Sequence, residues 1–162
     1  MAVDKKFEIV KHEGYRFIGK TVYARAFGKS EKVFDALWGY DDWLFGNLDN
    51  MKEHATEEIH NATLMTWDKY DDKNCLLGYT RGRFMKSDAP VPSDMDYIDI
   101  PEGYIAKWAG SCDGYPEMYV RDKVAQTGEY EPATHIFMGE LFPKDENGNM
   151  LFEFFLACTK KG

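Results

Sequence analysis

Two segments of this 162-residue chain have nearly the same order of residues. Each has an alternating apolar run, the tripeptide Glu-Gly-Tyr and a second apolar run: FEIVKHEGYRFIGK at 7–20 and DYIDIPEGYIAKWAG at 96–110. A helix-like stretch and a long hairpin pattern follow each copy. A duplicated unit restricts the fold to two similar halves, and a ligand pocket tends to form at the seam between halves.

The first half is expected to contain two strands, a helix and a hairpin. Alternating apolar residues predict the strands, and apolar residues at three- and four-residue steps predict the helix. The expected elements are strands at 7–10 and 17–26, a helix from Ser30 to about Met51, and hairpin strands at 62–68 and 75–84. The first two strands are expected to pair with each other around His12-Glu13-Gly14. Gly39 weakens the helix, so we expect a break near 40–42.

The second half repeats this order. Its expected elements are strands at 97–100 and 104–108, a helix opened by Pro116 and closed at Gly128, and hairpin strands at 134–142 and 150–159. Residues 85–95 carry two prolines and small polar residues, which is typical of a linker. The sequence therefore predicts an α+β chain of two β-β-α-β-β half-repeats, about 1–86 and 95–162, joined by a linker at about 87–94.

Charge and cysteine content narrow the class of protein. The net charge is −8, and an acidic surface repels nucleic acid but suits a cationic ligand or a basic protein partner. The three cysteines are an odd number without C-x-x-C spacing, which indicates reduced thiols. The N-terminus lacks the apolar core of a signal peptide, and no apolar run is long enough for a bilayer. We expect a cytoplasmic protein without direct contact to nucleic acid or membrane.

Several motifs fail on their spacing. Gly28-Lys29-Ser30 resembles the end of a phosphate-binding loop, but Tyr23 stands where that loop needs its first glycine. Asp145 and the asparagines after it resemble a calcium loop, but Leu156 stands at its closing carboxylate position. The four histidines lack metal-ligand spacing, and no nucleophile-elbow sequence supports a serine hydrolase. We expect neither a metal nor a cofactor.

The last predicted strand carries the strongest candidate site. Side chains alternate along a strand, so 152, 154, 156 and 158 share the face that a sheet packs against its helices. Glu153 and Phe155 share the other face, which places a carboxylate beside an aromatic ring. The residues expected to line a common aromatic groove are Glu153, Phe155, Glu140, Met138, Trp67, Tyr79, Trp108, Tyr40 and Trp43.

Such a groove favours flat, lipophilic and cationic ligands. Aromatic walls stack on flat molecules and attract cations, and a carboxylate can neutralise a bound cation or act as a general base. Alternatives stay open at this point. Glu153 is an ordinary solvated carboxylate if its strand face is exposed, and Trp67, Tyr79 and Trp108 serve equally well as core residues. Tyr40 and Trp43 fit either the groove or a dimer contact.

Three segments of the second half carry a family resemblance: IPEGY at 100–104, GEYEP at 128–132 and FEFFL at 152–156. With them the chain resembles the GyrI-like family, the small-molecule-binding domain also found in AraC-type and multidrug-sensing MerR-type regulators. The resemblance implies two pseudo-symmetric units in an antiparallel sheet, with helices on one side and a ligand groove on the other. It also implies a glutamate among aromatics that receives lipophilic cations. The family's other frequent glutamate falls at Met138 here.

The repeats occupy nearly the whole chain, so the resemblance implies a stand-alone member. Three functions follow from it. The first is binding of lipophilic or aromatic, cationic small molecules. The second is hydrolysis of reactive cyclopropane-containing compounds, with Glu153 as the catalytic carboxylate and the Tyr79 hydroxyl stabilising developing charge. The third is modulation of a protein partner such as DNA gyrase.

Overall fold

The computed structural model describes residues 3–25, 39–56, 61–66, 73, 76–111, 116–133, 138–141 and 152–162. The chain divides into two compact units, unit 1 formed by Met1–Glu13 with Glu102–Gly162, and unit 2 formed by Gly14–Pro101. The chain therefore passes from one unit to the other twice. Both passages fall at a Glu-Gly-Tyr motif, the feature that the two repeats share most closely.

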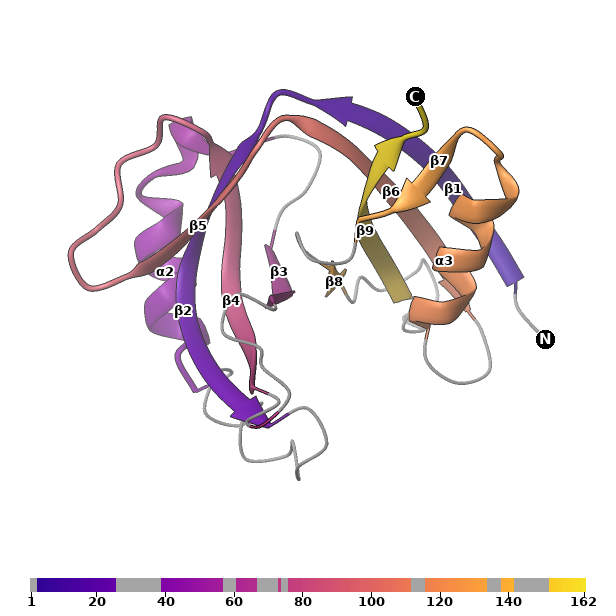
Figure 1. The fold of residues 1–162 in the computed structure, drawn as a ribbon. Coiled ribbons are helices and arrows are strands. Elements are labelled where there is room, and N and C mark those ends of the chain that lie inside the picture. The colour runs from indigo at the N-terminus through magenta and orange to yellow at the C-terminus, as the bar shows by residue number, and fades with distance from the viewer. Residues whose placement is uncertain are drawn as a thin grey trace. The chain divides into compact units, whose positions relative to one another are not determined.

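Unit 2 is a four-stranded antiparallel sheet with one described α-helix (Figure 1). The sheet order is β3 (Asn61–Thr66), β4 (Leu76–Lys86), β2 (Tyr15–Arg25) and β5 (Asp96–Ile100). Helix α2 (Asp41–Asp49) precedes a short 3-10 turn, η1 (Lys52–His54). The helix buries Leu44 and Leu48 against Ile18 and Met85 of the sheet.

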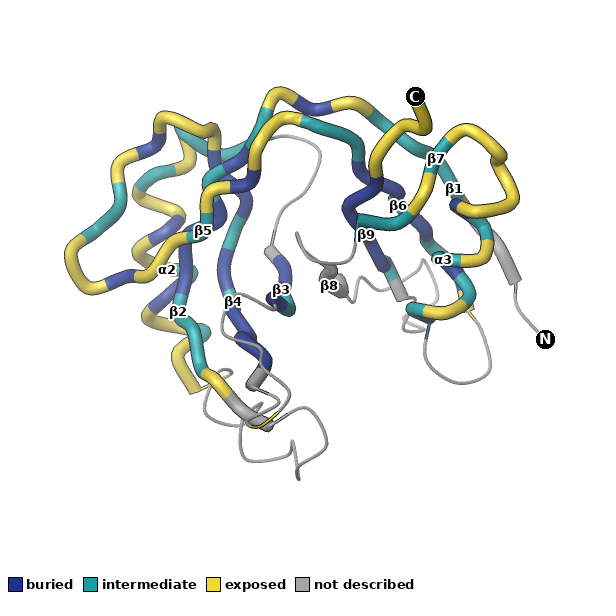
Figure 2. The backbone as a smooth tube through the Cα atoms, in the orientation of Figure 1, coloured by how far each residue is buried: buried dark blue, intermediate teal, exposed yellow. Residues whose placement is uncertain are grey.

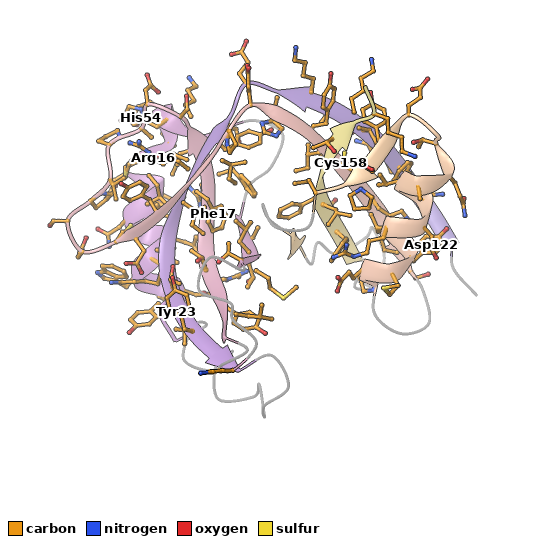
Figure 3. The ribbon with its side chains drawn as sticks, viewed as in Figure 1. Arg16, Phe17, Tyr23, His54, Asp122 and Cys158 are labelled. Carbon is orange, nitrogen blue, oxygen red and sulfur yellow. The ribbon has the colours of Figure 1, made fainter. Side chains whose placement is uncertain are left out.

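The other face of this sheet has an aromatic cluster. The Phe84 ring lies 4.8 Å from the Phe17 ring and 5.2 Å from the Tyr15 ring, both in edge-on contact. Figure 3 labels Phe17 on β2. Strand alternation thus puts apolar residues on both faces of β2, because Ile18 packs toward α2 and Phe17 away from it.

Unit 1 has the same kind of sheet. Its order is β1 (Val3–His12), β6 (Gly103–Ser111), β9 (Phe152–Lys160) and β8 (Met138–Leu141), with the short β7 (Tyr130–Pro132) paired to the end of β9. Helix α3 (Pro116–Gln126) contacts β6, β7 and β9. Buried positions concentrate in β9 here and in β4 of unit 2 (Figure 2).

One predicted pairing is wrong. The strands expected at 7–10 and 17–26 do not form a hairpin around residues 12–14. Strand β1 instead pairs with β6 of the second repeat, with Phe7 opposite Trp108, and β2 pairs with β5, with Tyr15 opposite Ile100. The physical reason is that the repeats carry the same alternating pattern, so a strand of one copy can pair with a strand of the other as well as with its own neighbour. Gly14 has φ 110°, a backbone conformation that suits glycine and lets the chain pass between units.

Most other element predictions are confirmed. Helix α2 begins at Asp41, inside the break expected at 40–42, and α3 begins at Pro116. Strands β3 and β4 pair as a hairpin, and so do β8 and β9. Strand β7 was not expected. Residues 30–38 and the hairpin turns at 71–74 and 142–150 lie wholly or largely outside the described residues.

The segment expected as a linker lies inside unit 2. It connects β4 to β5, and its residue Ala89 is fully buried with the core around α2. The Arg16 guanidinium donates to the Ala89 carbonyl oxygen at 2.8 Å and to the Asp99 carboxylate at 2.8 Å. The half-repeats at 1–86 and 95–162 therefore do not coincide with the compact units. No described helix is long and apolar enough to span a membrane.

Two glycines face each other in the β2–β4 ladder, Gly19 and Gly82. A Cβ on Gly19 would collide with the Arg81 carbonyl oxygen, and one on Gly82 with the Ile18 carbonyl oxygen. The backbones approach so closely here that neither position accepts a side chain.

We therefore expect Gly19→Ala and Gly82→Ala each to lower the free energy of unfolding by about 2 kcal/mol or more. Gly46→Ala is the control, because a Cβ there meets nothing and the residue lies on the exposed side of α2. It should stabilise by about 0.5–1 kcal/mol. Urea unfolding measures all three, and equal stability of Gly82→Ala and the unmodified protein would contradict the ladder geometry.

Candidate functional site

Helix α3 defines the two faces of the unit 1 sheet. The Trp108 ring of β6 contacts the Tyr119 ring of α3 edge-on, with centroids 5.4 Å apart. Trp108 is the ladder partner of Phe154 in β9, and both are 1 % exposed. Cross-strand partners share a face, so Phe154, Leu156 and Cys158 face the helix, as their alternation predicts. Trp108 accordingly belongs to the core beneath α3.

The opposite face of β9 carries Glu153 and Phe155. Their partners in β6 are Ala109 and Lys107 respectively. Phe155 is 2 % exposed, and the neighbouring Ala157 and Ile105 on this face are also buried. Glu153 is partly exposed. A carboxylate thus lies at the edge of a buried apolar group, on the side of the sheet away from α3.

Among the described residues, the charges on this face leave Glu153 without a counter-ion. The cation beside Phe155, Lys107, lies opposite Glu8 in the β1–β6 ladder, with Nζ 3.9 Å from Oε1 of Glu8. Glu8 also pairs with Lys6 at 3.0 Å. In the part of the chain that the structure describes, Glu153 makes no hydrogen bond and no ion pair. An acceptor with both carboxylate oxygens available is suited to a cation supplied by a ligand.

Strand β8 contains the other two predicted site residues of unit 1, Met138 and Glu140. Met138 pairs with Leu156 and Glu140 with Phe154. Their side chains, like the whole of Trp67, lie outside the described residues.

The remaining predicted residues belong to unit 2. Tyr79 in β4 pairs with Val22 and Met65 and is 7 % exposed. Burial raises the pKa of the Tyr79 hydroxyl, so it is a neutral hydrogen-bond donor at pH 7. The two predicted catalytic residues, Glu153 and Tyr79, are thus described in separate units.

Tyr40 and Trp43 lie at the start of α2 and are 43 % and 39 % exposed. Both rings already have a cation–π contact with Lys20. The Lys20 Nζ lies 5.9 Å from the Tyr40 ring centroid and 5.4 Å from the Trp43 ring centroid. These contacts place both rings on the helix side of unit 2 and make them an exposed aromatic pair around a lysine.

The structure also shows a hollow that sequence reasoning missed. A cavity of about 420 Å³ in unit 2 is lined by Thr21, Tyr23, Thr66 and residues 95–98. The sequence gives little indication of this cavity. The cavity forms because β5 pairs with β2 only as far as Gly19, whereas β2 continues to Arg25. Elsewhere, the described residues contain no group of three histidine, cysteine or acidic side chains arranged to hold a metal.

The chain matches no protein-family model and no curated protein. Solved structures match nearly its full length. SAV2435 bound to tetraphenylphosphonium is 9 % identical with a TM-score of 0.61, over 97 % of this chain and 94 % of that one. A protein from Staphylococcus aureus MU50 described as a bacterial transcription regulation protein is 7 % identical with a TM-score of 0.54, over 95 % and 98 %.

A hydrolase from Listeria innocua is 12 % identical with a TM-score of 0.52, over 96 % of this chain and 93 % of that one. At these identities the likeness concerns the fold alone. The fold class is α+β, with two antiparallel four-stranded sheets and two described α-helices. It is consistent with the GyrI-like fold that the sequence resemblance implies.

The helix side of β9 yields a pH-dependent prediction. Burial raises the pKa of the Cys158 thiol to about 11, although a backbone hydrogen bond at Ala106 acts in the opposite sense. A raised pKa means that the thiol stays protonated to a higher pH in the folded state than in the unfolded state. The stability from the buried thiol is therefore complete below the unfolded pKa and is lost as the pH rises from about 9 to about 11.

We expect the unfolding free energy of the unmodified protein to fall more steeply over this range than that of Cys158→Ala, by at most about 3 kcal/mol. Urea unfolding at several pH values measures the difference, and groups common to both proteins cancel. Parallel curves for the two proteins would show that the thiol is not buried as described.

Proposed function

We propose that this protein is a GyrI-like binding protein for lipophilic, aromatic cations, and that Glu153 supplies the counter-charge. The observation that carries the proposal is the state of Glu153. It is partly exposed beside the buried Phe155, and the neighbouring Lys107 is paired with Glu8. The other predicted groove residues, Met138, Glu140, Trp67, Tyr79, Tyr40 and Trp43, stay predictions, and Trp108 lies in the core beneath α3.

The charge on Glu153 sets the sign of the ligand, and the surroundings set its polarity. A carboxylate next to apolar surface is less well hydrated than one in open water, so an arriving cation gains more from it. A compact ammonium loses strong hydration when it enters such a place, whereas a cation wrapped in aromatic rings is weakly hydrated and gains from apolar contact. The ligand expected at Glu153 is therefore large, apolar and positive.

The structural comparison supports the same ligand class. Tetraphenylphosphonium is a cation surrounded by four phenyl rings, and the structure that contains it shares this fold over nearly both whole chains. Its charge has no N–H donor, so the expected interaction with Glu153 is electrostatic rather than a hydrogen bond.

Titration with tetraphenylphosphonium tests the proposal. We expect saturable binding by calorimetry, and about tenfold or more weaker binding by Glu153→Gln, because the substitution keeps the shape and removes the charge. Glu129→Gln is the matched control, since it removes the same charge from an exposed turn of the same unit. It should bind as tightly as the unmodified protein.

The neutral analogue triphenylphosphine oxide separates charge from shape. Its affinity should be low and equal for the unmodified protein and Glu153→Gln. If Glu153→Gln and Glu129→Gln bind tetraphenylphosphonium equally well, Glu153 is not the counter-charge, and absence of saturable binding would overturn the proposed function itself.

A second candidate function is hydrolysis of an electrophilic cyclopropane conjugated to a carbonyl group. The structural likeness to a protein described as a hydrolase, together with the available oxygens of Glu153, favours it. Water would attack a ring carbon while Glu153 takes its proton. The ring C–C bond breaks, its electron pair moves to the carbonyl oxygen, and that oxygen finally receives the proton, a net addition of water.

Turnover of such a compound should fall at least about a hundredfold in Glu153→Gln, since general-base catalysis contributes about that much. Binding of the neutral compound should persist, because the amide keeps the shape of the site. Tyr79→Phe, which removes only a hydroxyl, tests the predicted charge-stabilising role in the same assay. Equal turnover by Glu153→Gln and the unmodified protein would remove Glu153 from the reaction.

A further inference from the structure

The cavity in unit 2 arises because two paired strands differ in length. Strand β2 has 11 residues, but β5 has 5 and pairs only with Tyr15 to Gly19. Beyond Gly19 the edge of β2 on this side lacks a strand partner among the described residues. Asp96, the first residue of β5, partly replaces that strand, because its Oδ2 accepts a hydrogen bond from the Thr21 amide at 2.9 Å.

One tyrosine ring, that of Tyr23, lies beside this carboxylate, whereas Tyr97 is the ladder partner of Ile18 and its ring lies over Arg16 on the α2 side of the sheet. Tyr23 is 37 % exposed and Tyr97 53 % exposed, so both rings present surface to solvent (Figure 3 labels Tyr23). Ile98, the ladder partner of Phe17, adds aliphatic surface, whereas the Met95 side chain packs into the core around α2. The volume of about 420 Å³ is in the range of small-molecule sites, and the lining is mixed, with hydroxyl groups and one carboxylate beside apolar surface.

Asp96 is the only charged residue of this lining. Its Oδ2 is engaged by the Thr21 amide, whereas no described residue donates to Oδ1 or forms an ion pair with Asp96. The cation next to the hollow is Arg16, whose guanidinium lies 5.1 Å from the Tyr97 ring centroid. Arg16 is held by Asp99 and by the Ala89 carbonyl oxygen, so it is not directed at Asp96.

We propose that this cavity is a second small-molecule site, specific for small organic ammonium ions with an aromatic or aliphatic side group. An N–H of the ammonium would donate to Oδ1 of Asp96 while the charge lies near the Tyr23 ring and the side group contacts Ile98. The ligand differs from that expected at Glu153, because a hydrogen-bonding carboxylate selects an N–H donor. The site lies wholly in unit 2 and does not depend on the proposed function.

The probe is 2-phenylethylammonium, with 2-phenylethanol as its neutral control. Asp96→Asn is the decisive variant, because the amide oxygen still accepts from Thr21 while the charge is removed. We expect binding of the ammonium, measured by calorimetry, to weaken about tenfold or more. Asp94→Asn removes the same charge from an exposed position that does not line the cavity, and should leave binding unchanged.

Backbone amide chemical shifts locate the ligand. Addition of the ammonium should perturb Thr21, Tyr23 and Ile98, and the alcohol should not compete. Tyr23→Ala, a substitution at an exposed ring that lines the cavity, should weaken binding a few-fold and guards against a folding defect in Asp96→Asn. Glu153→Gln should bind the ammonium normally, so failure of this site and failure of the proposed function are distinguishable.

Three outcomes would overturn the second site. They are no saturable binding of the ammonium at millimolar concentration, equal weakening by Asp94→Asn and Asp96→Asn, and shift changes confined to residues outside the cavity. In each case, any affinity that remains would come from the overall negative charge of the protein or from a different site.

Discussion

The pairing of strands between the two repeats is the interaction on which the rest of the structure depends. Strand β1 pairs with β6 and β2 pairs with β5, so each unit completes its sheet with a strand from the other repeat. Without this exchange, β6 and β2 would each lose a ladder partner, and the apolar residues on both faces of β2 would lose neighbours. The two Glu-Gly-Tyr motifs are where the chain changes unit, which explains why the repeats resemble each other most at those points.

Register then decides what each sheet face presents. In unit 1, β9 lies between β6 and β8, and Phe154 opposite Trp108 fixes the helix side. Glu153 therefore lies on the opposite face of the sheet. Its ladder partner in β6 is Ala109, which is two residues from Lys107. A slip of one residue would place the carboxylate under α3 and bury it against Trp108. The pairing of Lys107 with Glu8 has the same origin, because it depends on β1 being the neighbour of β6.

Local patterns in the sequence were sufficient for the fold class and for most elements. Pro116 marks the start of α3, and the apolar alternation at 152–158 predicts correctly which residues face the helix. Partner choice was not predictable in this way, because an alternating strand fits any partner of the same pattern and the hairpin at 12–14 was the shortest connection. Trp108 became a core residue through its contact with Tyr119, 11 residues away on another element. The cavity at Asp96 was missed because it follows from unequal pairing lengths, which only tertiary structure sets.

We propose Glu153, a carboxylate with no counter-ion among the described residues and beside apolar surface of the sheet, as the receptor for a lipophilic cation. A crystal structure of the tetraphenylphosphonium complex tests it most directly. We expect the phosphorus beside the Glu153 carboxylate, with phenyl rings against the face of β9 that points away from α3. A complex in which the ligand contacts only the helix side of the sheet, or lies away from Glu153 altogether, would contradict it.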